Sequence, residues 1–330
     1  MATLGATKPT LVDWAKRLDP SGKTAKIVEL LGQSNEILKD MQFVQGNLPT
    51  GHRTTVRTGL PTVYWRLLNA GVPSSKSTTA QVDEMCGSLE ARSEVDVDLA
   101  ALNGNTAEFR LSEATAFLEA MNQEMAQTLF YGNSGLAPEE FTGLSIRYSS
   151  TTATNGQNII SGAGAGSDNS SIWLIGWGQD KVTGTFPKGS QAGLVHEDLG
   201  VGDAFDGSNN RFRAYMDRWV WKTGLVVKDW RYAVRIANID ISNLVSKSSA
   251  ADLIELMIKA IHRIPMLDAC SPVFYMNRSC FQMLDIQKRD DVITGGGLRY
   301  ENVDGIPTPT FRGIPVRKCD QLLETEAVVS

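Results

Sequence analysis

Residues 111–131, LSEATAFLEAMNQEMAQTLFY, form the most regular pattern in the sequence and decide the fold class. Apolar side chains recur there every three or four residues, at Ala114, Phe117, Leu118, Met121, Met125 and Leu129. This spacing places them on one face of a helix. Ser112 and Glu113 suit a helix start, and Gly132-Asn133 stops it. The sequence therefore predicts a rigid helix of about 20 residues, or roughly 30 Å.

Upstream of this helix, residues 46–76 have the pattern of a long β-hairpin. Thr, Val and Arg predominate there, and turns are marked at Gly51, Gly59-Leu60-Pro61 and Asn69-Ala70-Gly71. Both faces of the hairpin are polar, so it has no core of its own. Because a two-stranded ribbon is only marginally stable in water, we expect it to lean on its parent domain or on a neighbouring molecule.

The segments on either side of the long helix have β patterns. Apolar and acidic residues alternate at residues 95–99 (VDVDL), which predicts a half-buried strand within residues 82–103. Residues 144–171 are rich in Ser, Thr, Gly and Asn and are predicted to be an exposed loop. Residues 172–241 are β in character and hold five of the seven tryptophans. The middle of the chain is therefore expected to be mostly β-structure.

The two ends of the chain add helices and further strands. Residues 1–40 are mixed and polar, with a helical stretch at residues 25–41. Towards the C-terminus the predicted elements are a helix at 251–264, a strand at 272–276, a helix from Asn277 to about 288, a hairpin at 300–316 turning at Asp304-Gly305, and a strand at 314–318. Together these patterns predict an α+β fold.

Composition excludes several classes of function. The net charge of −5 comes from 37 acidic and 32 basic residues spread along the chain, without the basic stripe that direct nucleic-acid recognition needs. No run of 18 apolar residues occurs and the N-terminus does not resemble a signal peptide, so no membrane association is expected. The four cysteines stand far apart, which favours reduced, mostly buried thiols.

Candidate chemical motifs do not meet the requirements of a catalytic or ligand site. Gly22-Lys23-Thr24 lacks the first glycine of a phosphate loop and a preceding strand. Residues 162–166, GAGAG, are not followed by a helix start, so a loop is favoured over a dinucleotide site. Glu94, Asp96 and Asp98 are predicted to share the solvated face of a strand rather than to bind a cation. With only three histidines, we expect no catalytic residue, no cofactor, no metal and no enzyme activity.

The order of these parts, together with short sequence matches, resembles the major capsid fold that tailed bacteriophages share with herpesvirus shells. The matching stretches are Thr58-Gly59-Leu60-Pro61, Tyr64-Trp65-Arg66, Phe130-Tyr131-Gly132-Asn133, Phe141-Thr142-Gly143-Leu144, Met276-Asn277-Arg278 and Arg312-Gly313-Ile314-Pro315-Val316. Residues 177–194 and 230–240 look most like capsid proteins of short-tailed phages of the Bordetella-phage type.

The resemblance implies a domain plan and a function. Residues 1–45 would be an N-terminal arm, 46–80 an extended loop, 81–135 and 265–330 a peripheral domain with the spine helix, and 140–262 an axial domain. Copies of the chain would self-assemble as hexamers and pentamers into an icosahedral head enclosing double-stranded DNA. A scaffolding protein, a portal and possibly a decoration protein would be partners, and packaged DNA would be contacted non-specifically. The protein would be part of the virion, assembled in the host cytoplasm.

Six side chains are predicted to contact neighbouring subunits: Arg53, Arg57, Trp65, Arg66, Trp219 and Trp221. The arginines would meet acidic partners, Trp65 would find apolar cover, and the other two tryptophans would help to close rings. Deleting residues 52–72 is expected to leave a folded subunit that cannot form shells. The same tryptophans allow an alternative, a β-rich phage adhesin or sugar-binding module. A metal- or nucleotide-dependent enzyme would rest on Gly22-Lys23-Thr24 alone.

Overall fold

A computed structural model describes residues 8–11, 13, 32–104, 106–290, 298–303 and 306–330. Its helices are α2 (Ile37–Asp40), α3 (Val97–Ala101), α4 (Thr106–Tyr131), α5 (Leu144–Arg147), α6 (Ile241–Ser246), α7 (Leu253–Ile261) and α8 (Arg278–Asp290). Its strands are β1 (Phe43–Gln45), β2 (Gly51–Gly59), β3 (Thr78–Met85), β4 (Gly87–Asp96), β5 (Ile159–Ser161), β6 (Asn169–Trp177), β7 (Val182–Phe186), β8 (Leu194–Phe205), β9 (Arg211–Val227), β10 (Ala233–Asp240), β11 (Ser271–Met276), β12 (Leu298–Val303), β13 (Ile306–Phe311) and β14 (Ile314–Lys318).

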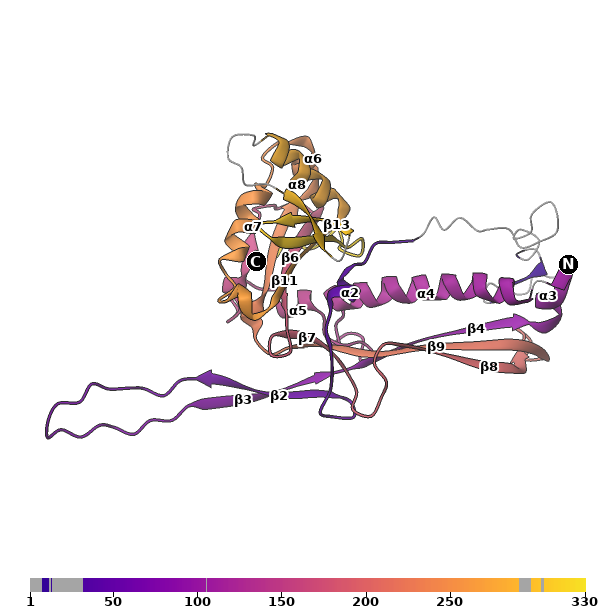
Figure 1. Ribbon diagram of the computed structural model, residues 1–330, viewed down its shortest axis with the longest axis horizontal. Helices are drawn as coiled ribbons and strands as arrows, with labels where there is room; N and C mark the ends of the chain where they lie inside the picture. Colours follow the sequence, from indigo (N-terminus) through magenta and orange to yellow (C-terminus); the bar gives the residue numbers. More distant parts are fainter. Residues whose placement is uncertain (1–7, 12, 14–31, 105, 291–297, 304–305) are drawn as a thin grey trace.

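Three bodies with different shapes make up the molecule (Figure 1). A lobe holds α6, α7, α8 and the strands around β6 and β11. A long arm consists of α4 lying beside β4, β9 and β8. A two-stranded ribbon, β2 and β3, projects from the opposite end of the molecule to α3. The predicted α+β class is confirmed, and the three bodies place very different surfaces at the two ends of the long axis.

The long helix that the sequence predicts is confirmed as α4, with 26 residues. It begins at Thr106 rather than Leu111, because Phe109 is buried and extends the apolar face by a turn. At the C-terminal end, the Gly132 N–H donates to the Thr128 carbonyl at 2.9 Å. A side chain at position 132 would meet the Phe141 carbonyl at 2.5 Å, so only glycine fits this stop.

The arm sheet packs on α4 through alternate residues of β9. Trp219 stacks on Phe117, Asp217 binds Arg110, and Arg110 lies over the Tyr215 ring at 4.9 Å. These three β9 residues are two positions apart, so the period of the strand presents them all to the helix. Within the arm, β9 pairs with β4 and β8, and its C-terminal end pairs with β7; all three pairings are antiparallel. The predicted β character of residues 172–241 is confirmed here and in the lobe.

One predicted strand ends earlier than its alternation suggests. The strand β4 stops at Asp96, and residues 97–101 form the short helix α3. The Asp96 carboxylate accepts hydrogen bonds from the N–H groups of Asp98 and Leu99 at 2.8 and 3.3 Å. Asp96, the last residue of β4, therefore caps a helix, and Asp98 does not share a strand face with Glu94 and Asp96.

Replacing Asp96 by alanine is expected to cost about 0.5–2 kcal/mol of unfolding free energy, because the cap hydrogen bonds are lost. Asp96→Asn keeps an acceptor oxygen in the same place and is the matched control, with little expected change. Denaturant unfolding of the unassembled subunit measures both variants. Equal destabilisation by alanine and asparagine would contradict the capping role.

The lobe contains the main core of the molecule. All nine residues of β6 are buried. The strand is central in the sheet and pairs on one side with β10 and on the other with β11. Trp173 and Trp177 of β6 are 0% and 1% exposed. The elements predicted towards the C-terminus are confirmed: α7 lies within its predicted range, β11 begins one residue before its predicted range, and β12 pairs with β13 as a hairpin. Asn277 accepts from the Cys280 N–H at 2.8 Å and caps α8 as predicted.

Residues 144–171 are not the exposed loop that their composition suggests. They contain α5, β5 and the start of β6, and Asn169, Ser170 and Ser171 are 0% exposed. The reason is pairing: β10 binds β5 on one side and β6 on the other. Small polar side chains are buried there because their hydrogen-bond partners come from distant segments. Of the expected loop, residues 162–166 have no regular structure.

The described elements group differently along the chain from the predicted domain ranges. Strand β11, in the range expected to be peripheral, pairs with β6 of the range expected to be axial. Strands β8 and β9, in the range expected to be axial, lie in the arm beside β4 and α4. Two predictions lie outside the described residues, the Gly22-Lys23-Thr24 motif and the Asp304-Gly305 turn, as do residues 25–31 of the helix predicted at 25–41. Of the remaining part of that helix, only residues 37–40 are helical, as α2.

Candidate interaction surface

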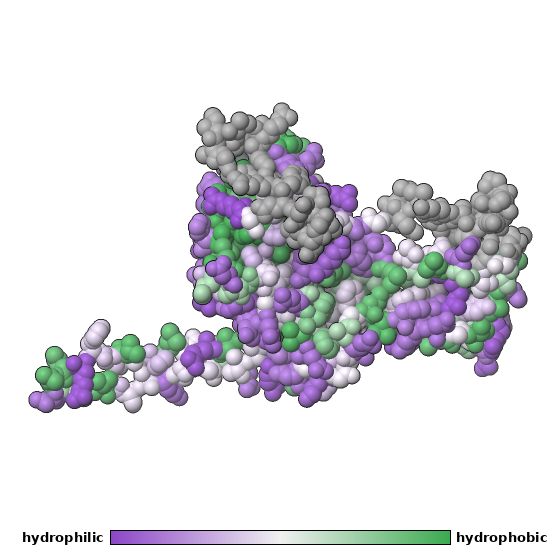
Figure 2. Space-filling model, viewed as in Figure 1, coloured by the Kyte–Doolittle hydropathy of each residue, from purple (hydrophilic) through white to green (hydrophobic). Residues whose placement is uncertain are grey.

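The ribbon carries the most exposed apolar surface of the described chain. Strands β2 and β3 pair with each other from Gly51–Met85 to Gly59–Thr78. This confirms a long hairpin, but its second strand lies beyond the predicted range of residues 46–76. Between them, residues 60–77 form an extended loop, here called the ribbon tip. Figure 2 shows hydrophobic residues gathered at its end. The large apolar residues of the tip and their exposed fractions are Leu60 81%, Val63 87%, Tyr64 51%, Trp65 104%, Leu67 79%, Leu68 95% and Val72 49%.

An exposed cluster of this kind requires a partner. Soluble monomers rarely expose contiguous apolar patches, and large ones mark interaction sites. The tip and the adjoining end of β2 also carry charge of one sign: residues 57–76 contain Arg57, Arg66 and Lys76 and no acidic residue. The combination of an apolar centre with basic residues around it is typical of a protein-binding surface.

The predicted contact residues of the ribbon have different surroundings. Trp65 is fully exposed, and Arg57 is exposed with no ion pair to another described residue. Arg66 donates from Nε to the Ala70 carbonyl at 2.9 Å within the tip. Arg53, in contrast, already pairs with Asp83 on the opposite strand, with two contacts of 2.6 Å. The acidic partner expected for Arg53 on a neighbour is thus found within its own ribbon.

The two tryptophans predicted for ring closure lie inside the arm. Trp219 is 2% exposed and sits between the rings of Phe117 and His196, each 5.2 Å away. Trp221 is half-buried and packs against the core. Both belong to the set of alternate β9 residues that face inward, so the sheet leaves Trp219 almost no surface for another molecule. Trp173, Trp177 and Trp219 are almost completely buried, so they cannot stack on a sugar. This burial removes most of the basis for the sugar-binding alternative.

A buried charge cluster joins the C-terminal segment to the lobe and was not apparent in the sequence. The Arg235 guanidinium donates to Glu326 at 2.8 Å, and both side chains are 5% exposed. The Tyr131 hydroxyl donates to the other Glu326 oxygen at 2.5 Å, and Ser171 also binds Glu326. Burial, and then the charge of Glu326, raise the pKa of Tyr131, so the hydroxyl keeps its proton. No local spacing in the sequence links two residues that are 91 positions apart.

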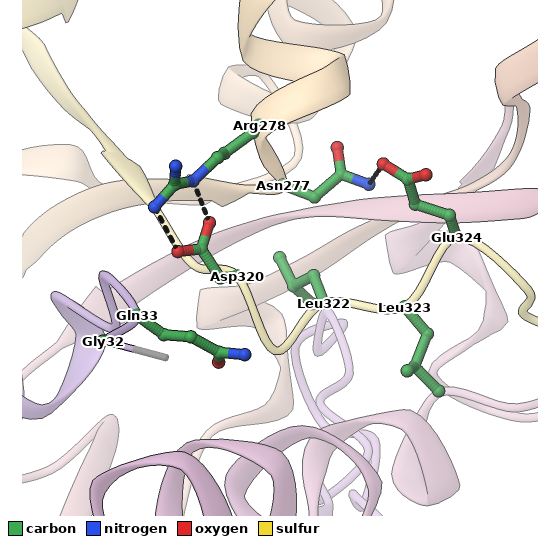
Figure 3. Close-up of a pocket in the computed structure, with 8 residues that line it drawn as sticks. All are labelled: Gly32, Gln33, Asn277, Arg278, Asp320, Leu322, Leu323 and Glu324. Atoms are coloured by element: carbon green, nitrogen blue, oxygen red, sulfur yellow. Dashed lines mark hydrogen bonds and ion pairs between the residues drawn. The ribbon is translucent and has the colours of Figure 1, made fainter. Parts of the chain in front are cut away.

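A crevice of about 520 Å³ lies between residues 32–33, the start of α8 and the C-terminal segment (Figure 3). Arg278 donates to both oxygens of Asp320 at 2.6 and 2.7 Å, and Asn277 donates to Glu324 at 3.2 Å. These polar side chains satisfy one another across the crevice. The arrangement therefore fastens the C-terminal segment to α8, and it is not a convergent set of free ligand groups.

The described residues hold neither a cluster of metal-binding side chains nor a helix suited to span a membrane. They include no group of three or more His, Cys, Asp or Glu side chains placed to hold a metal ion. No helix among them combines the length and apolar character needed to cross a membrane. The four cysteines are all free thiols, in agreement with their spacing.

A long helix beside an antiparallel sheet, a separate α/β lobe and a projecting ribbon together define a shell subunit of the tailed-phage major capsid class. A chain in the cryo-EM-derived structure of bacteriophage Epsilon15 is 34% identical, with a TM-score of 0.78 over 100% of this chain and 99% of that one. A chain of the bacteriophage JBD30 capsid is 8% identical, with a TM-score of 0.49 over 88% and 92% of the two chains. No curated protein matches the sequence.

The sequence matches the model of the family described as major capsid protein GP7 over residues 19–330. The chain belongs to this family. It is thus a phage capsid shell protein and part of the virion, as the resemblance implied, and the likeness to the Epsilon15 chain agrees with the short-tailed branch. Membership of a structural capsid family implies a non-enzymatic role.

Proposed function

We propose that copies of this chain associate head to tail into hexamers and pentamers, with the ribbon of each copy lying across the next. The exposed apolar tip is the observation that carries this proposal. The ribbon projects at one end of the long axis, whereas the N-terminal end of α4 and the arm sheet lie at the other (Figure 1). Because a heterologous contact between two different surfaces closes into a ring when the rotation allows it, rings of five or six are the expected product.

The surface that receives the tip is the arm of the neighbouring copy. The helix α4 contains Glu108, Glu113, Glu119 and Glu124 against the single base Arg110, whereas the tip contains only bases. Leu111 and Leu118 of α4 are 69% and 40% exposed and offer apolar cover for the tip. Charge complementarity of this kind fixes register and excludes wrong partners, while the apolar contacts supply the affinity.

We base the proposed domain plan on the three bodies seen in the structure, the arm, the ribbon and the lobe. We assign the peripheral role to the arm (α4, β4, β8 and β9), the extended loop to the ribbon, and the axial role to the lobe. These assignments differ from the ranges expected from the sequence, where 265–330 was peripheral and all of 140–262 axial. Pairing of β11 with β6 and of β9 with β4 supports the change.

The remaining partners belong to the same proposal. Assembly in the host cytoplasm would involve a scaffolding protein and a portal, possibly also a decoration protein, around double-stranded DNA. The net charge of −5 and the absence of a basic stripe in the sequence support a wall that contacts packaged DNA only non-specifically.

Reversing the tip charges tests the head-to-tail contact. The triple variant Arg57→Glu, Arg66→Glu, Lys76→Glu is expected to lower the yield of shells at least about tenfold, because like charges would then face α4 of the neighbour. Sedimentation and electron microscopy measure the yield. Adding Glu108→Lys and Glu124→Lys, both exposed on α4, is expected to restore part of it. Full assembly of the triple variant at low salt would contradict the proposed contact.

A further inference from the structure

The root of the ribbon contains an ion pair that the ribbon itself does not need. Glu84, near the end of β3, binds Arg147 at the end of α5 through two contacts of 2.5 and 2.6 Å. The two side chains are only 9% and 18% exposed. Such a bidentate pair fixes the geometry of both partners, since the planar guanidinium meets the carboxylate edge to edge.

Arg147 holds the ribbon to two other segments of the body. Its guanidinium also donates to the Thr142 carbonyl at 3.1 Å and to the Leu225 carbonyl of β9 at 3.3 Å. Its own carbonyl accepts from Asn155 at 2.7 Å. One side chain thus connects the ribbon with the arm sheet and with the segment that follows α4. Arg147 is therefore placed to set the angle between the ribbon and the body.

The ribbon has close contact with the body only at this root. At residue 224 of β9 a side chain would meet the Met85 carbonyl of β3 at 2.7 Å, so the two backbones approach closely there. Beyond this point, β2 and β3 are exposed or half-buried, apart from Glu84 itself. From residue 84 to residue 68 an extended chain spans up to about 50 Å. A swing of about 10° at the root would therefore move the tip by roughly 9 Å.

We propose that the Arg147–Glu84 pair is a positioning clamp, which aims the ribbon so that its tip meets the arm of a second copy of this chain. The inference rests on the proposed head-to-tail function and names the residues that control its geometry. A free ribbon samples many directions, and only a small fraction of them places the tip on the neighbour. The clamp holds the ribbon in one direction before the subunits meet, which lowers the entropic cost of association.

A double variant tests the clamp without leaving a buried charge. Arg147→Met together with Glu84→Gln removes both charges, so neither partner is left uncompensated in the interior. The matched control is Asp83→Asn, which breaks the Arg53–Asp83 pair one residue away. That pair has similar contact distances, both 2.6 Å, but it lies within the ribbon and is about half exposed. The parent, the double variant and the control all carry the same cysteine substitutions for spin labelling.

Pulsed electron–electron double resonance measures distances between spin labels and so reports the direction of the ribbon in unassembled subunits. Labels on Thr79→Cys of β3 and Lys222→Cys of β9 report the ribbon-to-arm distance, with Cys86 and Cys270 replaced by serine throughout. In the parent and in Asp83→Asn we expect one narrow distribution. In the double variant we expect its width to grow at least about twofold and the shell yield to fall at least about tenfold.

The outcomes separate the clamp from the head-to-tail contact. A narrow distribution in the double variant would overturn the clamp, whatever the shell yield. A broad distribution with a normal yield would also overturn it, because assembly would then not depend on the direction of the ribbon. If variants of the tip assemble normally while the double variant broadens the distribution, the proposed docking of the tip fails and the root contact still holds the ribbon.

Discussion

A subunit carrying Glu326→Gln is expected to lose about 3–5 kcal/mol of its free energy of unfolding. The substitution leaves the Arg235 charge buried with no counter-charge, in a site where both side chains are 5% exposed. An amide also brings two donors to a place where Arg235, Tyr131 and Ser171 already donate to the carboxylate. Denaturant unfolding of the unassembled subunit gives the free energy directly.

Two further variants check that the loss comes from the broken pair. Asp83→Asn removes a carboxylate from the half-exposed Arg53–Asp83 pair, and exposed pairs often contribute nothing measurable. Removing both buried charges, as Arg235→Met with Glu326→Leu, is expected to be far milder than Glu326→Gln, since no unpaired charge is left. A loss below about 1 kcal/mol in Glu326→Gln would show that the cluster is not a structural anchor.

Replacing the ribbon tip, residues 60–77, by Asn-Gly is expected to abolish shells while leaving the subunit folded. The short turn keeps β2 and β3 paired, whereas deletion of residues 52–72 would also remove most of β2. No buried residue lies in the tip, so the core loses nothing. What disappears is the exposed apolar cluster around Trp65 together with Arg66 and Lys76, whereas Arg57 of β2 remains.

Light scattering and electron microscopy distinguish the products of this variant. We expect megadalton particles from the parent chain and monomers or small oligomers from the variant, with the same unfolding midpoint within error. The single substitution Trp65→Ala tests the composition of the tip separately from its length, because it keeps all residues of the tip but removes its most exposed ring. Shells of normal size from the tip replacement would contradict the proposed head-to-tail contact.

Local patterns predicted the elements whose residues carry their own signal. The helix α4 follows from apolar spacing and a glycine stop, and the α8 cap follows from Asn277. The ribbon follows from polar alternation between turns. At residues 97–99 the alternation failed, because the capping carboxylate of Asp96 favours a helix that the same spacing does not reveal.

The sequence by itself determined the long helix, the ribbon without a core and, through its family pattern, a capsid protein. Only the tertiary structure decided what each side chain faces. It placed Trp219 inside the arm, Arg235 beside Glu326 and Glu84 beside Arg147. The physical reason is the separation of the interacting residues along the chain. Local spacing shows which face of an element is apolar, but buried polar groups need partners from distant segments, and only folding brings these together.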